Sequence, residues 1–215
     1  MKVLLFANGL RSGGKERQVM EIAKGLSVKK EIEIVLVIMN SEIFYDDIHK
    51  INIPIEILER GNRSMITVMY NLYKLCKKYR PDIIHTWDYL STFYSTFIVK
   101  MMNIKLINGA IRNAEYNFIP FGKMWLMTKL IYRWPDMIIA NTRSGLMSLN
   151  LENKGIYIYN GFDESRIGNL VEPDIIRSRF NIKEKIIVGM VAKFKPDKDY
   201  ESFIEAAKIV LLKFN

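Results

Sequence analysis

The chain has 215 residues, of which 49% are hydrophobic and 26% are charged, a balance typical of a soluble globular protein and not of a disordered one. Its 32 basic and 23 acidic residues give a net charge of +9, which favours an anionic partner such as nucleic acid, anionic lipid or a phosphorylated substrate. The single cysteine, Cys76, excludes a disulfide framework and indicates a reducing compartment, and no apolar run approaches the ~18 residues of a membrane span.

Strands are expected where short apolar runs are bounded by turn residues. These runs are residues 3–7, 31–39, 54–58, 82–85, 105–110, 136–140 and 155–159. Helical spacing of apolar side chains predicts helices between them. These begin near Lys15, cover 65–79 before the stop at Pro81, cover 89–102, and follow a cap at Thr142 or Ser144. Strands that alternate with helices indicate an α/β fold with a Rossmann-like, doubly wound parallel sheet.

The pattern changes after residue 161. Residues 162–184 are polar and irregular, with a short helix over 173–180, and are interpreted as a linker. A buried strand over 186–192 and a helix over 200–214 then predict the opening of a second Rossmann-like domain. The predicted organisation is a domain over 1–161, a linker over 162–184 and a truncated domain over 185–215, because so short a segment cannot bury a core alone.

The first predicted strand runs into the first helix through Gly13 and Gly14. Glycines here let a ligand approach backbone N–H groups at the positive end of a helix, so the turn can hold a phosphate or a sugar. A turn required only by the α/β fold is an equally good interpretation. The spacing with Gly9 does not make G-x-G-x-x-G, which argues against a dinucleotide site.

Five motifs follow the carboxyl ends of predicted strands, where ligands bind in open parallel sheets. They are Gly-Gly-Lys-Glu-Arg at 13–17, Asp-Ile-Ile-His-Thr-Trp at 82–87, Ile-Ala-Asn-Thr-Arg-Ser-Gly at 139–145, Ile-Tyr-Asn-Gly-Phe-Asp at 158–163 and Val-Gly-Met-Val-Ala-Lys-Phe-Lys-Pro-Asp-Lys-Asp-Tyr at 188–200. In this order the series resembles the glycosyltransferase group 1 family, which is retaining and has the GT-B fold. The resemblance spans nearly the whole chain.

The resemblance implies two facing Rossmann-like domains. A nucleotide-sugar donor is held mainly by the second domain, a lipid-linked or saccharide acceptor mainly by the first, and neither a cofactor nor a metal takes part. Gly13 and Gly14 would face the donor phosphates and the reacting sugar. Lys193 and Lys198 match the family's basic pair, whose fixed charges stabilise the departing diphosphate. The family usually has Arg at the first of these positions, and Lys193 gives a point charge in place of a bidentate clamp.

Two catalytic candidates follow from the resemblance. Arg112 stands where some relatives place a functional His, and His85 ends a strand that faces the expected cleft. A packed histidine bonded to backbone is an equal alternative for His85. Arg17, Trp87 and Asn160 would lie on the acceptor side. The pair of glutamates with which relatives contact the donor sugar is absent from this sequence, and Glu164 and Glu172 match only its spacing and are rejected.

Other polar candidates are assigned structural roles. His49 is expected at the surface and Cys76 in the core, and two histidines with one cysteine offer no zinc site. The D-x-D spacing of Asp197 and Asp199 suggests a metal pair, but Lys198 lies between the carboxylates and the basic motif surrounds them, so we reject metal binding.

The segment 118–134 combines five aromatic residues with Lys123, Lys129 and Arg133. A helix of this composition could lie at an anionic membrane surface, or it could simply cover the sheet. The Lys and Arg residues are otherwise spread along the chain without a nucleic-acid module, so nucleic acid is not an expected partner. The first apolar run ends at Ala7, so we expect no signal peptide and a cytoplasmic location, possibly peripheral at the inner face of the membrane.

The sequence therefore predicts a glycosyltransferase that is retaining, metal-independent and active in envelope or capsule polysaccharide synthesis. This fragment, without most of the donor domain, is expected to be inactive alone. Two alternatives stay open. One is a binding module, the acceptor-binding half of a split transferase. The other is a nucleotide-sugar epimerase of the same architecture, which releases free sugar.

Overall fold

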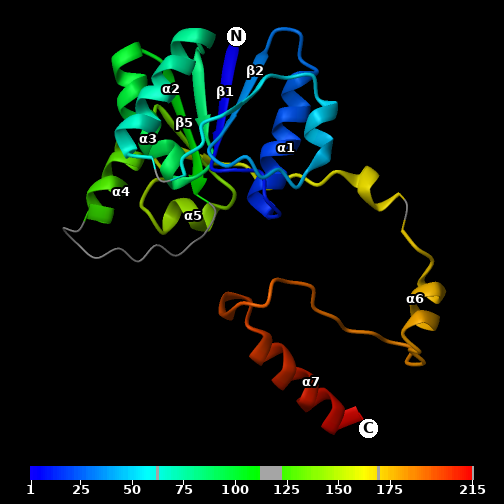
Figure 1. Ribbon diagram of the computed structural model, residues 1–215. Helices are drawn as coiled ribbons and strands as arrows, with labels where there is room; N and C mark the ends of the chain where they lie inside the picture. Colours follow the sequence, from blue (N-terminus) through cyan, green and yellow to red (C-terminus); the bar gives the residue numbers. More distant parts are fainter. Residues whose placement is uncertain (62, 112–122, 169, 215) are drawn as a thin grey trace. The chain divides into compact units, whose positions relative to one another are not determined.

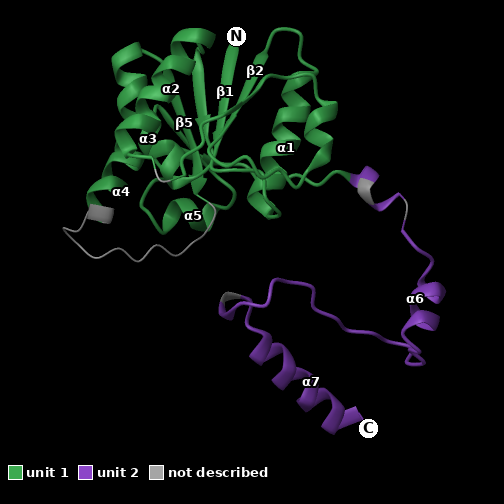
Figure 2. Ribbon diagram, in the orientation of Figure 1, with its two compact units in different colours: residues 1–163 green, residues 164–215 purple. Residues whose placement is uncertain are grey.

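A computed structural model describes residues 1–61, 63–111, 123–168 and 170–214. It divides into two compact units, which are treated separately below: unit 1, Met1–Asp163, and unit 2, Glu164–Asn215 (Figure 2). The sequence placed the end of the first domain at residue 161, two residues before the end of unit 1. None of the described helices has both the length and the apolar character needed to cross a bilayer.

The described residues of unit 1 form a seven-stranded, wholly parallel sheet in the order β3-β2-β1-β4-β5-β6-β7 (Figure 1). Its strands are β1 Lys2–Ala7, β2 Glu33–Ile38, β3 Ile55–Ile57, β4 Ile83–Thr86, β5 Lys105–Ile111, β6 Met137–Ala140 and β7 Gly155–Tyr157. Each lies within or beside a predicted run. The predicted α/β class with a doubly wound parallel sheet is confirmed.

The centre of the sheet is buried on both faces because helices cover each side. β1 pairs with β2 on one side and β4 on the other, and Leu4, Leu5 and Phe6 are fully buried. Successive side chains point to opposite faces. Leu4 and Phe6 pack toward α2, α3 and α4, whereas Leu5 packs toward α1. Figure 1 shows the same division, with α2 and α3 together on one side of the strands and α1 on the other.

Side-chain caps begin three of the helices of unit 1, namely α2, α3 and α5. The helices of this unit are α1 Gly14–Ser27, α2 Met65–Tyr79, α3 Tyr89–Met102, α4 Lys123–Arg133 and α5 Arg143–Met147, with a short 3-10 helix, η1, at Asp46–Lys50. Asp88 begins α3 through a capping box with Ser91. Thr142 caps α5, as predicted, by accepting from the Gly145 N–H. Cys76 lies on α2 and is buried in the core, and His49 is exposed, so both predictions are confirmed.

Unit 2 contains η2 Glu164–Ile167, α6 Pro173–Arg179, η3 Pro196–Lys198 and α7 Tyr200–Phe214. Both helices were predicted, but the strand over 186–192 was not formed, and that prediction was wrong. Ile186, Val188 and Val191 are 80%, 78% and 103% exposed. A parallel strand needs a neighbour to receive its hydrogen bonds and cover its side chains, and the described residues of unit 2 offer no second strand.

Candidate active site

A pocket of about 360 Å³ lies in unit 1 between α1 and the strand face beneath it. α1 contributes one wall, and the other comes from β4, β6 and the segment that follows β7. Its lining residues are Gln18, Glu21, Ile22, Gly25, Leu26, His85, Trp87, Ile139, Ile158, Tyr159, Asn160 and Gly161. Trp87 and Asn160 follow the carboxyl ends of their strands, so the pocket opens at the edge where the sequence predicted it.

His85 and Trp87 form the inner wall of this pocket. His85 pairs in register with Leu5 of β1, so it points to the face that α1 covers. Its ring lies 4.9 Å from that of Trp87, measured between ring centroids, with the planes tilted by 37°. The two side chains are only 8% and 3% exposed. A ligand would therefore meet a ring pair held by packing, and the imidazole brings a titratable group close to it.

The segment after β7 is fastened to α1 by one side chain. The Gln18 amide donates to the Gly161 carbonyl at 2.8 Å, and the Gly161 N–H donates back to Gln18 Oε1 at 3.0 Å. Lys24 Nζ also lies 3.9 Å from a carboxylate oxygen of Asp163. These contacts place Asn160 at the mouth of the pocket, where its own side chain is exposed.

At the glycine turn that begins α1, the backbone of Gly13 is hydrogen-bonded to Tyr45. The Gly13 N–H donates to the Tyr45 hydroxyl at 3.0 Å, and that hydroxyl donates to the Gly13 carbonyl at 2.8 Å. A Cβ added at Gly13 would collide with the Glu16 carboxylate, whereas one at Gly14 would meet nothing within 4 Å. The Gly13 amide is therefore already paired, and Gly14 has the open approach that a ligand would need.

The charges around this turn form two small groups. Lys15 Nζ lies 3.2 Å from Glu16 and 4.0 Å from the Asp88 carboxylate. The Arg17 guanidinium stacks 4.3 Å from the centroid of the Tyr45 ring and lies 4.0 Å from the Glu21 carboxylate. Because Glu21 lines the pocket, Arg17 reaches its rim through Glu21, not by lining it directly.

Sequence reasoning did not identify three residues that shape this site, namely Gln18, Glu21 and Tyr45. Glu21 could have been found, since it lies four positions after Arg17 on a predicted helix and such pairs face each other. Tyr45 gave no signal, because it lies in an irregular segment between two strands. Gln18 contacts a residue 143 positions away, which no local pattern encodes.

The predicted site residues separate into three groups. His85, Trp87 and Asn160 line one pocket, and Gly13, Gly14 and Arg17 lie at the first turn of the helix that forms its wall. Arg112 lies outside the described residues. Lys193 and Lys198 belong to unit 2 and are exposed there.

Unit 2 has its own small pocket of about 260 Å³, and neither predicted lysine lines it. The lining residues are Phe194, Lys195, Pro196, Asp199, Tyr200 and Glu201. The Asp199 carboxylate accepts from the Ser202 N–H at 3.2 Å, which supports the first turn of α7. Within the described ranges no cluster of three His, Cys, Asp or Glu residues is placed to hold a metal ion.

The predicted membrane helix, α4, contacts the sheet through its apolar side. Ile131 is fully buried in the core, and Met127 and Leu130 pack against it. Lys129 and Arg133 are exposed, while the side chain of Lys123 lies outside the described part of the chain. Covering the sheet and presenting basic side chains to solvent are therefore compatible functions of one helix.

Comparison with known proteins gives matches over the same region. Residues 12–166 match the model of Glycosyltransferase Family 4. An Escherichia coli protein named UDP-Gal:alpha-D-GlcNAc-diphosphoundecaprenol alpha-1,3-galactosyltransferase is 25% identical over 158 residues, which cover 66% of this chain and 40% of that protein.

Solved structures share the fold. The Anabaena protein Alr3699/HepE in complex with UDP-glucose superposes with a TM-score of 0.77 at 17% identity, over 96% of this chain and 57% of its own. The UDP-GlcNAc 2-epimerase of Neisseria meningitidis bound to UDP-GlcNAc superposes with a TM-score of 0.58 at 15% identity, over 86% of this chain and 54% of its own. The chain spans 40% of the curated relative and little more than half of each of these structures.

Proposed function

The chain belongs to Glycosyltransferase Family 4. On that basis we propose that it is the acceptor-side part of a GT-B glycosyltransferase. The enzyme transfers a sugar from a nucleotide-sugar donor to a lipid-linked or saccharide acceptor. One observation carries the proposal. The family match, over 12–166, contains every residue that lines the pocket between α1 and the sheet.

The pocket has the chemistry that an acceptor requires. Its walls are largely aliphatic and aromatic, and a few polar groups converge on it from opposite sides, namely Gln18 and Glu21 from α1 and His85 and Asn160 from the sheet. The flat rings and aliphatic side chains suit the apolar face of a sugar or the first units of a lipid carrier. The polar groups would orient its hydroxyls.

His85 is proposed to act on the acceptor hydroxyl. A neutral imidazole can accept the proton of a hydroxyl that attacks the donor sugar. Packing against Trp87 holds the ring in place, so little reorganisation is needed when a ligand arrives. Arg112 remains a proposed charge-stabilising residue on the strength of its position in the sequence alone.

The donor is proposed to be a uridine diphosphate sugar. The name of the E. coli relative specifies UDP-galactose, and the Anabaena structure contains UDP-glucose. Lys193 and Lys198 of unit 2, proposed as the opening of the donor domain, would stabilise the charge that develops on the departing diphosphate. Retention of configuration, independence from a metal and a role in envelope polysaccharide synthesis rest on the family resemblance of the sequence motifs.

The acceptor is proposed to be lipid-linked, and the protein to work in the cytoplasm against the inner face of the membrane. The E. coli relative is named for a diphosphoundecaprenol acceptor. The exposed Lys129 and Arg133 on α4 provide charges that an anionic surface would attract.

Transfer of radiolabelled sugar from UDP-galactose or UDP-glucose to a lipid extract tests the proposal. We expect nothing measurable from the 215-residue chain alone, and transfer when a complete second domain is supplied. Lys198→Ala should then remove most of the activity, whereas Lys208→Ala, a matched change on the exposed side of α7, should leave it intact. Robust transfer by this chain alone would contradict the assignment of the donor site to the second domain.

The histidines supply a second matched pair. His85→Gln should lower kcat by on the order of a hundredfold or more, as expected for loss of a general base. His49→Gln, an equivalent change at an exposed position, should have no effect. Equal activity of the two variants would reduce His85 to a packing residue.

An epimerase is the alternative that the fold allows, since three similar structures, with TM-scores of 0.55, 0.58 and 0.57, are UDP-GlcNAc 2-epimerases. The same assay distinguishes it. Release of a free 2-epimeric sugar from UDP-GlcNAc, without any glycoside, would favour the epimerase.

A further inference from the structure

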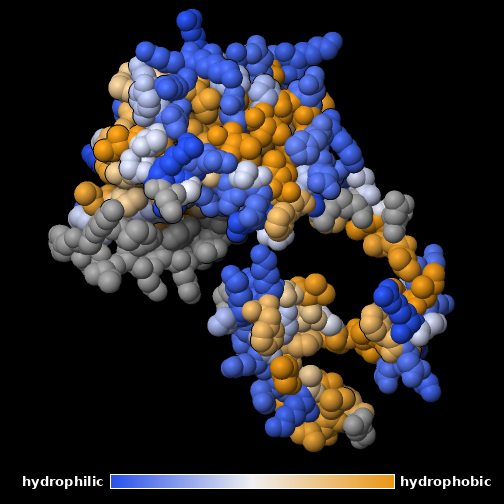
Figure 3. Space-filling view, viewed as in Figure 1, coloured by the Kyte–Doolittle hydropathy of each residue, from blue (hydrophilic) through white to orange (hydrophobic). Residues whose placement is uncertain are grey.

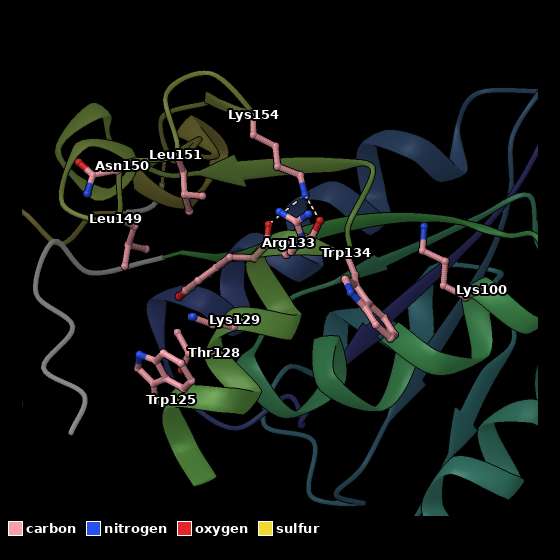
Figure 4. Close-up of a pocket in the computed structure, with 11 residues that line it drawn as sticks. Lys100, Trp125, Thr128, Lys129, Arg133, Trp134, Leu149, Asn150, Leu151 and Lys154 are labelled. Atoms are coloured by element: carbon pink, nitrogen blue, oxygen red, sulfur yellow. Dashed lines mark hydrogen bonds between the residues drawn. The ribbon is translucent and has the colours of Figure 1, made fainter. Parts of the chain in front are cut away.

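A second and larger pocket, of about 870 Å³, lies beside α4 (Figure 4). Three segments of unit 1 line it: residues 125–134, which cover most of α4 and the residue after it, the end of α3, and residues 149–154 before β7. Its lining residues are Lys100, Trp125, Thr128, Lys129, Tyr132, Arg133, Trp134, Leu149, Asn150, Leu151 and Lys154. Four of these are cations and three are aromatic, and among the described residues of its wall there is no Asp or Glu.

The pocket is separate from the candidate active site. Trp134 lies three residues before β6 begins and Lys154 immediately precedes β7, so both lie near the amino ends of these strands. Trp87 and Asn160, by contrast, follow the carboxyl ends of β4 and β7. Because all strands of a parallel sheet run in the same direction, their amino ends and carboxyl ends lie on opposite sides of the sheet.

Lys154 is held at the end of α4. Its ammonium donates to the Tyr132 carbonyl at 3.0 Å and to the Arg133 carbonyl, two of the acceptors that a helix leaves unpaired in its last turn. Figure 4 shows both bonds reaching from Lys154 to the helix end. An ammonium has three N–H donors, so one remains for a ligand after these two contacts.

Like charges are held together around that ammonium. Burial lowers the pKa of Lys154, and the positive charges of Arg133 and Lys100 lower this pKa further. The carboxylate that opposes them, Asp136, is otherwise engaged. It accepts from the Leu106 N–H at 2.9 Å and lies 3.4 Å from Lys105 Nζ. A bound anion would relieve this repulsion and strengthen the cationic form of Lys154.

The aromatic wall is fixed by its own contacts. The Trp134 ring packs edge-to-face on Phe97 of α3, with centroids 5.3 Å apart. Lys129 Nζ lies 3.7 Å from the centroid of the Trp125 ring, a cation–π contact. The Thr128 hydroxyl lies 3.3 Å from that of Tyr89. Flat rings thus stand beside cations on a wall that α3 and α4 form together.

We propose that this pocket is a second ligand site of the protein and that it binds a phosphate-bearing group, with Arg133, Lys154 and Lys129 as the phosphate contacts. Several cations in a wall whose described residues include no Asp or Glu can recognise a phosphate through charge-assisted hydrogen bonds. The adjacent rings would accommodate the apolar or sugar part attached to it. The group could belong to a soluble phosphate ester or to a lipid headgroup, which share this chemistry. The inference does not depend on the proposed transferase activity.

Pyrophosphate is the soluble probe, and the fluorescence of the tryptophans at the site reports its binding. We expect saturable quenching by pyrophosphate with the full chain. Changing Lys129→Gln and Arg133→Gln together should weaken the affinity for pyrophosphate by about tenfold or more. Each lost hydrogen bond between a cation and a phosphate removes part of the binding free energy, and about 1.4 kcal/mol corresponds to tenfold. The control variant, Lys29→Gln with Lys30→Gln, removes the same amount of charge from an exposed segment outside the pocket. Its affinity for pyrophosphate should change by less than about twofold, because salt screens charges that are distant from the ligand.

Vesicles distinguish the source of the phosphate. If the protein sediments with phosphatidic acid vesicles and pyrophosphate releases it from them, the ligand is a lipid headgroup. If the protein binds pyrophosphate but does not bind the vesicles, the ligand is a soluble phosphate ester. The proposal is overturned if pyrophosphate does not bind, or if the two double variants lose equal affinity. Unchanged circular dichroism of both variants, whose altered side chains are all exposed, excludes misfolding as the cause.

Discussion

Two apolar runs in this molecule have strand-like sequences and opposite fates. Residues 3–7, Val-Leu-Leu-Phe-Ala, form most of β1, paired on both sides and covered on both faces. Residues 186–192, Ile-Ile-Val-Gly-Met-Val-Ala, form no strand. Leu4, Leu5 and Phe6 are fully buried, whereas Val188 is 78% exposed. An apolar run becomes a parallel strand only when partners for its hydrogen bonds and side chains are present.

The helices of the two units repeat this difference. Leu72 and Cys76 on α2 are fully buried against the sheet. On α7, Ile209, Leu212 and Phe214 are 53%, 78% and 83% exposed although the helix is as long as α2. Full burial of such side chains contributes about 1.5–3 kcal/mol each, a gain that unit 2 does not obtain within itself. Among its described residues, local contacts such as the Tyr200 hydroxyl donating to the Ala192 carbonyl and the Phe194 ring beside that of Tyr200 support its structure.

The largest test of this comparison uses two truncations of apolar side chains. Leu5→Ala should lower the free energy of unfolding by about 2–5 kcal/mol, because it removes buried contacts and leaves a cavity. Val188→Ala should change it by less than about 0.5 kcal/mol, since that side chain is exposed. Urea unfolding followed by circular dichroism measures both. A comparable loss from the second variant would mean that residues 186–192 are buried in solution.

The next test uses the pH dependence of unit 1. Burial raises the pKa of the Cys76 thiol to about 12, while the unfolded thiol ionises near 8.5. Between these values the unfolded chain releases a proton that the folded chain keeps, so stability falls as pH rises, by about 1.4 kcal/mol per pH unit at most.

Cys76→Ala is the control for that slope. It should lower the free energy of unfolding by the same amount at every pH below about 8.5, where the thiol is protonated in both states. Above about pH 9 the free energy of unfolding should fall less steeply with pH in the variant than in the unchanged protein, because the variant has no thiol to ionise. Parallel curves would contradict the burial of the thiol. Unit 2 contains no cysteine and should make no such contribution.

Helix caps offer a smaller and matched pair. Asp88 accepts from the Ser91 N–H at 3.0 Å and also from the Asn8 N–H, so Asp88→Ala should destabilise unit 1 by about 1 kcal/mol. Asp199→Ala should reduce the helicity of α7 and leave the cooperative transition of unit 1 in place. A shift of that transition by the second variant would show that the two units unfold together.

The smallest effect is expected at the ion pair near the end of unit 1. Lys24 and Asp163 are partly exposed and 3.9 Å apart, so Lys24→Gln should lower the unfolding free energy by less than about 0.5 kcal/mol. The Gln18 bonds to Gly161 should hold the segment without it. A larger loss, measured as a lower Tm, would mean that the ion pair between Lys24 and Asp163, and not the Gln18 hydrogen bonds, holds the segment after β7 against α1.

The sequence alone determined the strands of unit 1 and their parallel arrangement. Buried runs and helical periodicity are local signals, and seven of the eight predicted strands are present. It also placed His85, Trp87 and Asn160 at the ends of strands, and strand order then brought them to one pocket. The position of each residue follows from the element that precedes it, whereas the roles of these three residues stay predictions.

The tertiary structure decided what local patterns do not contain. The pairing of Gln18 with Gly161 and of Gly13 with Tyr45 joins segments distant in sequence, and the four cations of the pocket beside α4 come from three separate segments. The absence of a strand over 186–192, within the described chain, is likewise a tertiary result. The spacing of apolar residues indicates which face of a segment can pack against a neighbour. Whether that face is buried, and whether the backbone is hydrogen-bonded, depends on the presence of a neighbouring segment.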